Sequence, residues 1–267
     1  MSENDVLKKI YAAKAQHLED EMAREPYGAI RERAKASVAS RRPFLEKLRE
    51  ESPSALITEI KRASPSAGLI ARDFDAATIA EMYERAGADC ISILTESDHF
   101  LGDIHYVSQV RDVVKLPLLR KDFMTHPYQV AQAAAYGADC ILLIVGGLRD
   151  EQIQACLDEA HDYSLDVLME VHDVKNLDRA LEFEGVNFIG VNNRNLRTMI
   201  TDIAIGEHIL PKVPRGVFAI SESGVASPSD MERLHKAGAK GFLIGEALMK
   251  SDDPAALIKS LKRVYAN

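Results

Sequence analysis

The sequence predicts an α/β fold, a closed (β/α)8 or TIM barrel with an N-terminal helical extension. Two observations indicate this fold class. Eight short apolar runs alternate with helical patterns from residue 54 to the last helix. The runs are continuous rather than alternating, which is typical of parallel strands buried on both faces. Eight such units fit a closed barrel better than an open doubly wound sheet, which is the alternative.

The expected strands are apolar runs, rich in Ile, Leu and Val. Helical patterns such as DAATIAEMYERAGAD and DEQIQACLDEAHDY separate them. A weak repeat (AGADCISILT, YGADCILLIV and AGAKGFLIGE) ends a helix at glycine before the next run begins, and glycine suits the left-handed cap of a helix. The eight strands are predicted at residues 54–60, 90–95, 117–122, 140–145, 166–171, 188–193, 217–223 and 241–246.

The first 50 residues read as helix. The segment VLKKIYAAKAQHLEDEMA places apolar residues at helical spacing among charges. Pro26 interrupts this pattern, and AIRERAKASVASRRPFLEKLREE resumes it. We expect residues 1–50 to be a helical extension packed on the barrel, and residues 1–267 to form a single barrel domain.

Composition limits the function classes. The chain has 267 residues, 46% of them hydrophobic, and a formal charge of −8, which argues against nucleic acid or an anionic membrane as a partner. The three cysteines predict neither disulfides nor a metal site, and we expect them to be buried in a reducing cytosol. No signal-peptide core is evident, and the longest apolar run is too short to span a bilayer. We therefore expect a cytoplasmic protein.

Polar side chains gather where the predicted strands end. In a barrel these carboxyl ends share one rim, which carries the active site. The opposite ends of the strands look mostly apolar or small. The rim residues expected from this pattern are Glu59, Lys61, Thr95, Glu96, Arg120, Lys121, Asp122, Glu170, His172, Asn192, Asn193, Arg194, Glu222 and Ser223.

Each candidate also has a plainer structural interpretation. Glu59 and Lys61 share one face of a strand and can form a structural ion pair. Lys121 can be an exposed loop cation, and His172 a hydrogen-bonding loop residue. Glu170 follows a strongly apolar strand, so a partner or a raised pKa is expected. Two lysines and three glutamates from four strands can nevertheless supply an acid, a base and neighbours that tune them. Two cations are expected to face solvent: Arg62 and Arg120.

A phosphate site is expected at the last two strands, which are followed by SESGVASPSD and LIGEALM. Many barrels bind phosphate here on backbone N–H groups. Gly224 and Gly245 allow a ligand to approach the backbone closely. Hydroxyls are available from Ser64 and Ser223, and positive charge from Lys61 and Arg194.

Seven motifs, in order along the chain, resemble the indole-3-glycerol phosphate synthase family of the tryptophan pathway. They are EIKRASPSAG, LLRKDFMTHPYQV, GADCILLIV, LMEVHD, IGVNNRNLRT, SESGV and FLIGEALM. KDF with PYQ, and NNRNL before SESG, are the most specific of them. The resemblance runs from the first helix to the last and implies a (β/α)8 barrel with an N-terminal helical extension.

The resemblance also implies a reaction. The substrate would be the phosphosugar-anthranilate 1-(2-carboxyphenylamino)-1-deoxyribulose 5-phosphate. The enzyme would close a ring from an aryl carbon onto the C2 carbonyl and release carbon dioxide and water, giving indole-3-glycerol phosphate. No metal and no organic cofactor would take part. The sequence names no partner enzyme.

The resemblance assigns roles to individual residues. Lys121 would be the general acid, with Lys61 close by. Glu170 would be the general base or acid, and Glu59 its partner in shaping the site. A lysine near a ketone leaves a Schiff-base route open. Substrate hydroxyls would be held, and the lysines oriented, by Asn192 and Glu222. The phosphate would be held by Ser64, Arg194, Ser223, Gly224 and Gly245. The aromatic ring would pack on Phe123, Leu142 and Leu196.

Departures from the family pattern are confined to loops. Ala67 stands where lysine is frequent, and MTHPYQ replaces the more usual IIDPYQ. Glu246 follows Gly245 where some members have serine. We expect its carboxylate to point away from a phosphate while its backbone N–H faces the ligand.

Two other functions are open to such a barrel. A related phosphosugar enzyme, such as phosphoribosylanthranilate isomerase, would keep the phosphate loops without needing Lys61, Lys121 and Glu170 together. A non-catalytic barrel that binds a phosphorylated metabolite would need cations but not a full acid–base set.

Overall fold

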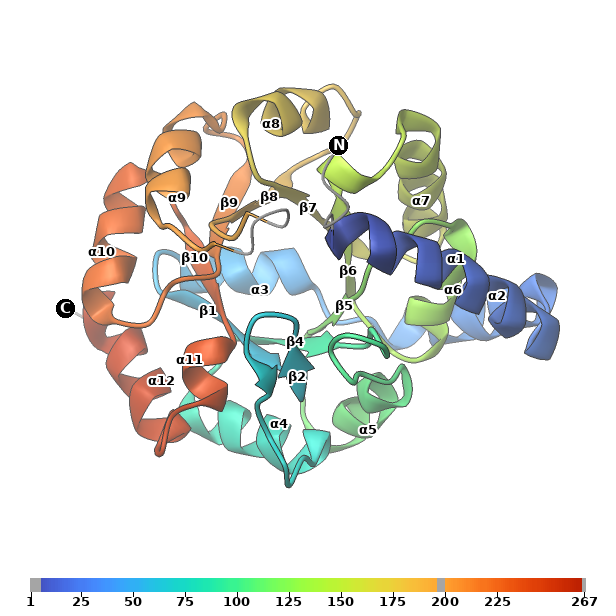
Figure 1. The fold of residues 1–267 in the computed structure, drawn as a ribbon, viewed down its shortest axis with the longest axis horizontal. Helices are drawn as coiled ribbons and strands as arrows, with labels where there is room; N and C mark the ends of the chain where they lie inside the picture. The colour runs from blue at the N-terminus through green and yellow to red at the C-terminus, as the bar shows by residue number, and fades with distance from the viewer. Residues whose placement is uncertain (1–5, 196–199, 266–267) are drawn as a thin grey trace.

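Eight parallel strands close into a barrel in the computed structural model, which describes residues 6–195 and 200–265 (Figure 1). The order around the barrel is β1-β10-β9-β8-β7-β6-β5-β4, and β4 pairs with β1. The predicted fold class is therefore confirmed. The strands are β1 (Ala55–Ile60), β4 (Cys90–Leu94), β5 (Leu118–Lys121), β6 (Cys140–Ile144), β7 (Asp166–Val171), β8 (Phe188–Asn192), β9 (Phe218–Glu222) and β10 (Gly241–Ile244).

Helices surround the strands on the outside of the barrel (Figure 1). A short hairpin of β2 (Ala63–Ser64) and β3 (Gly68–Leu69) follows β1. None of the helices in the described part of the chain is long and apolar enough to cross a membrane. The surrounding helices are α4 (Ala76–Ala86), α5 (His105–Val113), α6 (Pro127–Ala135), α7 (Asp150–Asp162), α8 (Val174–Ala180), α9 (Ala204–Ile209), α10 (Pro228–Ala237), α11 (Glu246–Met249) and α12 (Pro254–Lys262).

Apolar side chains fill the barrel interior and the layer between strands and helices. Alternate residues of each strand point to opposite faces, so one strand serves both layers. Ile57 and Leu243, for example, belong to the interior cluster, whereas Leu56 and Ile244 belong to the outer one. All three cysteines are buried, as expected.

Glycines end three helices at the positions that the repeat predicts. Gly87, Gly137 and Gly238 have φ values of 102°, 95° and 119°, the left-handed conformation that glycine adopts without strain. In the first two repeats an aspartate follows shortly after. Asp89 accepts a hydrogen bond from the backbone N–H of Leu56, and its counterpart, Asp139, from that of Leu118.

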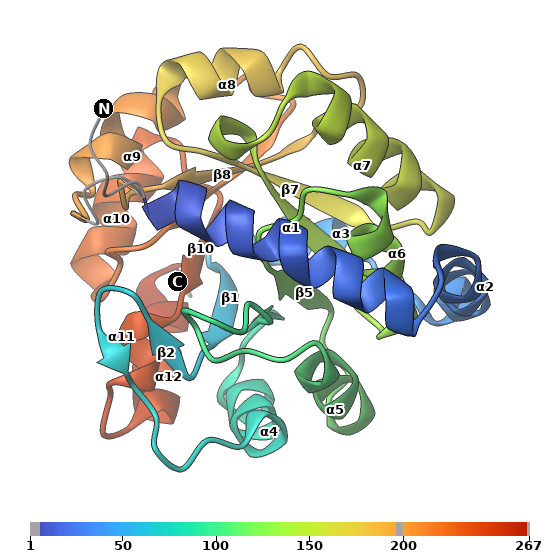
Figure 2. The ribbon, with the colours of Figure 1, turned by 45° about the vertical axis from the view of Figure 1, so that its right-hand side comes forward.

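The extension consists of α1 (Val6–Arg24), α2 (Tyr27–Ser37) and α3 (Phe44–Glu51). Helix α1 crosses the mouth of the barrel, and α2 lies on the outside (Figure 2). The expected continuous helix after Pro26 is broken before α3, where Pro43 takes the N-cap position. Proline lacks the N–H group that a helix interior requires. Helix α3 closes the opposite end of the barrel, where Phe44 packs on Phe188 at the start of β8.

That opposite end is more polar than the sequence suggested. Asp139 is 1% exposed and accepts hydrogen bonds from the backbone N–H groups of Leu118 and Arg42. The Arg111 guanidinium lies 2.5 Å from the same carboxylate. Asp89 and Asp139 were not predicted to be buried at this end, because each precedes an apolar run and lies in an expected short loop.

We predict that Asp139→Ala lowers the free energy of unfolding by about 3–5 kcal/mol, because Arg111 loses its carboxylate and keeps only the Gly137 carbonyl, and two backbone N–H groups lose their acceptor. Urea denaturation measures this. Glu81, which is paired with Arg85 at 3.6 Å on the surface, is the control. Glu81→Ala should change stability by less than about 0.5 kcal/mol. Equal losses in both variants would contradict the structural role given to Asp139.

Candidate active site

The six residues predicted to be catalytic lie together at the carboxyl end of the barrel. They border two adjoining cavities of about 340 and about 80 Å³. Five residues line both cavities, so the two are parts of one site: Glu59, Lys61, Lys121, Arg194 and Ser223. Glu222 also lines the larger cavity, and Glu170 and Asn192 also line the smaller one.

Lys121, the last residue of β5, lies between two carboxylates from other strands. Its Nζ is 2.6 Å from Glu222 Oε2 and 3.1 Å from Glu170 Oε2. Burial opposes the charge of the ammonium group, but the nearby carboxylates Glu222 and Glu170 outweigh burial and raise the pKa of Lys121 above its ordinary value. The side chain is thus a largely buried, charged ammonium group, not the exposed loop cation of the plainer interpretation.

The two carboxylates around Lys121 differ in proton affinity. Burial raises the pKa of Glu222 to about 7, since the charge of Glu170 adds to the effect and the attraction of Lys121 only partly offsets it. Burial also acts on Glu170, but Lys121 and His172 overcome it and hold the pKa of Glu170 below its usual range. Two neighbouring carboxyls with separated pKa values can take different roles in proton transfer.

Glu59 and Lys61 form the ion pair that the plainer interpretation expected. Lys61 Nζ is 2.7 Å from Glu59 Oε1, and both side chains are buried. Both also line the site, so the pair belongs to the cavity wall. Gly245 makes room for it: a Cβ there would come within 2.2 Å of Glu59 Oε1. This is a requirement for glycine that the sequence pattern alone did not reveal.

The larger cavity has the residues expected at a phosphate site. Ser223, Gly224, Gly245 and Arg194 line it. Ser223 and Gly224 have φ values of 64° and 76°, so β9 ends in a left-handed turn. Ser64 lies in the wall of the smaller cavity, which Arg194 also lines.

The carboxylate of Glu246 was expected to point away from this cavity, and this expectation is wrong. Glu246 lines the cavity. Its Oε2 accepts a hydrogen bond at 2.9 Å from the Arg194 guanidinium, and its Oε1 one at 2.7 Å from Lys250. The guanidinium also donates to the hydroxyls of Ser66 and Thr201. A carboxylate therefore holds the cation that the sequence assigned to phosphate, because both charges face the same opening.

The smaller cavity has an apolar wall. Phe123 and Leu142, two of the residues expected around the aromatic ring, lie in it with Leu94, Phe100 and Ile144. Phe100 was missed, although an aromatic residue shortly after the second strand is a signal that could have found it. Leu196, the third residue expected there, lies outside the described residues.

One of the expected solvent-facing cations is buried instead. Arg120 does not face solvent: it is 1% exposed and donates to Thr95 Oγ1, the Gln129 carbonyl and Asp122. His172 is a loop residue directly after β7, as its plainer interpretation expected, and its Nε2 lies 3.2 Å from Glu170 Oε1.

The structure thus defines a (β/α)8 barrel enzyme fold with an acid–base cluster between a cationic and an apolar subsite. A family model described as indole-3-glycerol phosphate synthase matches residues 7–261. The chain belongs to the indole-3-glycerol phosphate synthase family.

Curated relatives agree with this assignment. An indole-3-glycerol phosphate synthase of a Polaromonas species is 42% identical over 263 residues, covering 97% of this chain and 98% of the relative. The enzyme of the same name from Azospirillum brasilense is 42% identical over 261 residues, with 97% and 99% coverage. A solved thiamine phosphate pyrophosphorylase from Pyrococcus furiosus has a TM-score of 0.61 at 16% identity, over 81% of this chain and 96% of that one. This last likeness concerns the fold alone.

The pKa of Glu222 predicts a pH dependence of stability. Between the ordinary value of 4.5 and about 7, the folded protein keeps a proton on Glu222 that the unfolded chain has released. The free energy of unfolding should therefore fall as pH rises through this window. Glu222→Gln removes this titration, so its urea-derived stability should fall less steeply there. Glu151→Gln, at an exposed side chain, controls for the loss of one carboxylate, and equal slopes in all three proteins would refute the assignment.

Proposed function

We propose that the protein catalyses the indole-3-glycerol phosphate synthase reaction of tryptophan biosynthesis. Its substrate would be 1-(2-carboxyphenylamino)-1-deoxyribulose 5-phosphate, and its products indole-3-glycerol phosphate, carbon dioxide and water. The observation that carries this proposal is the position of Lys121, a buried cation between Glu170 and Glu222. Family membership supports the same reaction.

The shape of the site supports this substrate. The phosphate would bind in the larger cavity at Arg194, Ser223 and Gly224, with the N–H group of Glu246 close by. The carboxyphenyl ring would lie in the smaller cavity on Phe123 and its apolar neighbours. The ribulose carbons then lie between the two, beside the residues that line both cavities. Lys61 and Ser64 would contact the substrate from the β1 side.

Ring closure needs a proton donor at the carbonyl oxygen. The ring carbon that bears the carboxylate attacks C2, a carbon–carbon bond forms, and the carbonyl π electrons move to oxygen. Lys121, kept charged by its carboxylate neighbours, donates a proton to that oxygen. Loss of carbon dioxide returns the electrons of the broken carbon–carbon bond to the ring and restores its aromaticity.

Dehydration then needs an acid and a base. The hydroxyl on the former C2 leaves as water once it is protonated, and a base removes a proton from the adjacent ring CH2 group. Glu170 is assigned to this proton transfer, with Glu59 shaping the site around it. Asn192 and Glu222 would hold substrate hydroxyls and orient the lysines; the pKa of about 7 also lets Glu222 exchange a proton near neutral pH. No covalent adduct is required.

We also propose that residues 1–267 form one domain, with residues 1–50 as an extension of the barrel. In support, α2 packs on the barrel helix α6, and Arg31 Nε of α2 donates to Glu159 of α7 at 2.9 Å. A cytoplasmic location stays a prediction from the sequence.

The direct test is to incubate the purified protein with the carboxyphenylamino deoxyribulose phosphate and follow indole absorbance. Stoichiometric release of carbon dioxide should accompany the signal. A folded protein that forms no indole product would rule the reaction out. A parallel assay with phosphoribosylanthranilate as substrate tests the alternative function. If the protein converts this substrate and does not close the indole ring, it is the isomerase.

We predict that Lys121→Ala lowers kcat by roughly a hundredfold or more, the usual range for a group in acid–base catalysis. Inhibition by inorganic phosphate should stay nearly unchanged, since the phosphate would contact other residues. Lys115→Ala, at an exposed lysine after α5, is the matched control and should behave as wild type. Activity of Lys121→Ala within a few-fold of wild type would remove Lys121 from its role.

A further inference from the structure

We propose that Lys14 of helix α1 is a positioning residue for the reaction. Its buried ion pair with Asp122 would hold the end of β5, which presents Lys121 and Phe123 to the site. This inference rests on the proposed function, because the kcat in its test is measured for the proposed reaction. It assigns a role to one residue of the extension, which contributed none of the residues expected at the site.

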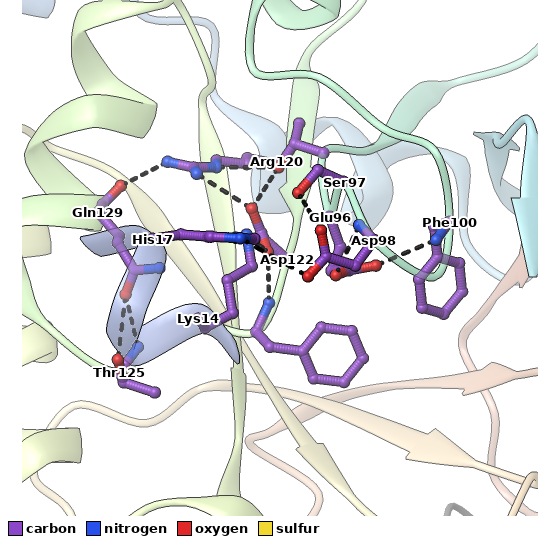
Figure 3. A network of polar contacts seen from close by, with 12 residues as sticks. Lys14, His17, Glu96, Ser97, Asp98, Phe100, Arg120, Asp122, Thr125 and Gln129 are labelled. Carbon is purple, nitrogen blue, oxygen red and sulfur yellow. Dashed lines mark hydrogen bonds and ion pairs between the residues drawn. The ribbon is translucent and has the colours of Figure 1, made fainter. Parts of the chain in front are cut away.

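Asp122 is the centre of a buried network (Figure 3). Its Oδ1 is 2.7 Å from Lys14 Nζ and accepts the backbone N–H of Phe123 at 2.8 Å. Its Oδ2 accepts from Thr95 Oγ1 at 2.6 Å and from Arg120 Nη2 at 3.0 Å. The Lys14 and Asp122 side chains are 6% and 0% exposed. One carboxylate thus joins α1, the end of β4 and both sides of Lys121.

The alternation of a strand gives this network its effect on Lys121. Consecutive strand residues point to opposite faces, so Arg120 points outward while Lys121 points into the barrel. Asp122 follows the strand and accepts a hydrogen bond from Arg120 at 3.0 Å. Arg120 is tied in turn to the Gln129 carbonyl in α6. The backbone on both sides of Lys121 is therefore anchored, by Arg120 before it and by Asp122 after it. The inner ammonium is placed accordingly between Glu170 and Glu222.

Helix α1 also reaches the apolar subsite. Tyr11, one turn before Lys14 and on the same side of the helix, packs edge-on against Phe123 at 5.9 Å between ring centroids. Phe123 in turn packs at 6.0 Å from Phe100, and both line the smaller cavity. Lys14 and Tyr11 thus fix the same segment from two directions, one by charge and one by packing.

A purely structural role would not require a lysine. Apolar residues of similar volume often replace a buried ion pair without loss of stability, whereas removal of one partner is costly. The chain offers a matched pair for comparison at the other end of the barrel. There Lys262 Nζ lies 2.6 Å from Asp89 Oδ2, and both side chains are largely buried. Lys14→Met and Lys262→Met should both destabilise the fold, but only the former should disturb the site.

The test combines turnover, ligand binding and stability. Lys14→Met is expected to lower kcat by about tenfold to a hundredfold, the size of effect that misplacement by an ångström can have. Inhibition by inorganic phosphate should stay unchanged. The affinity for anthranilate, titrated by its own fluorescence, should fall several-fold because Phe123 is no longer held. Lys262→Met should retain wild-type kcat and anthranilate affinity despite its lower stability.

A second variant keeps the test decisive if Lys14→Met does not fold. Asp122→Asn keeps the size of the side chain but removes its charge, and it should show the same loss of kcat. In the folded double variant Lys14→Met/Asp122→Asn, the two losses should not add, because Lys14 acts through Asp122. Wild-type kcat and anthranilate affinity in a folded Lys14→Met or Asp122→Asn would overturn the proposal. A wild-type protein without turnover would refute the proposed function instead, and anthranilate titration would still test Lys14.

Discussion

The site depends on one constraint: buried carboxylates need a counterion. Glu170 and Glu222 come from different strands and are almost wholly excluded from water, so each raises the cost of charging the other. Lys121 lies between them and offsets this repulsion. The same arrangement keeps the lysine charged and leaves one of the two carboxyls with a pKa near neutrality. The charge of the lysine and the separation of the two carboxyl pKa values thus have one cause, the electrostatic balance of the cluster.

Room for this cluster comes from residues without side chains. A Cβ on Gly190 in β8 would come within 2.0 Å of Glu222 Oε1, and one on Gly245 within 2.2 Å of Glu59 Oε1. Neither glycine has the positive φ that would explain it as a turn. Since the barrel interior is closely packed, these positions decide which way the carboxylates can lie. Glycine inside a strand often marks such a close approach.

The sequence predicts the barrel strands to within two residues at their ends, because continuous apolar runs report burial on both faces. It also brings the catalytic candidates to one rim, since parallel strands share a direction. The sequence could not predict which charged side chains pair with each other when they come from distant parts of the chain. Arg120 was expected to face solvent, but in the structure it is buried and paired with Asp122. Asp122 is also paired with Lys14, which belongs to the distant helix α1. Local pattern reports which face a residue occupies, whereas the pairing of charges depends on elements far apart in the chain.

The two ends of the barrel use buried carboxylates differently, and this separates stability from function. At the closed end, both oxygens of Asp139 are occupied by backbone and guanidinium donors. At the open end, Glu222 Oε1 is buried yet has no hydrogen-bond partner among the described residues. A buried acceptor without a donor is costly for a fold to keep. Under the proposed function, a substrate hydroxyl held by ionised Glu222 would offset this cost when the substrate binds.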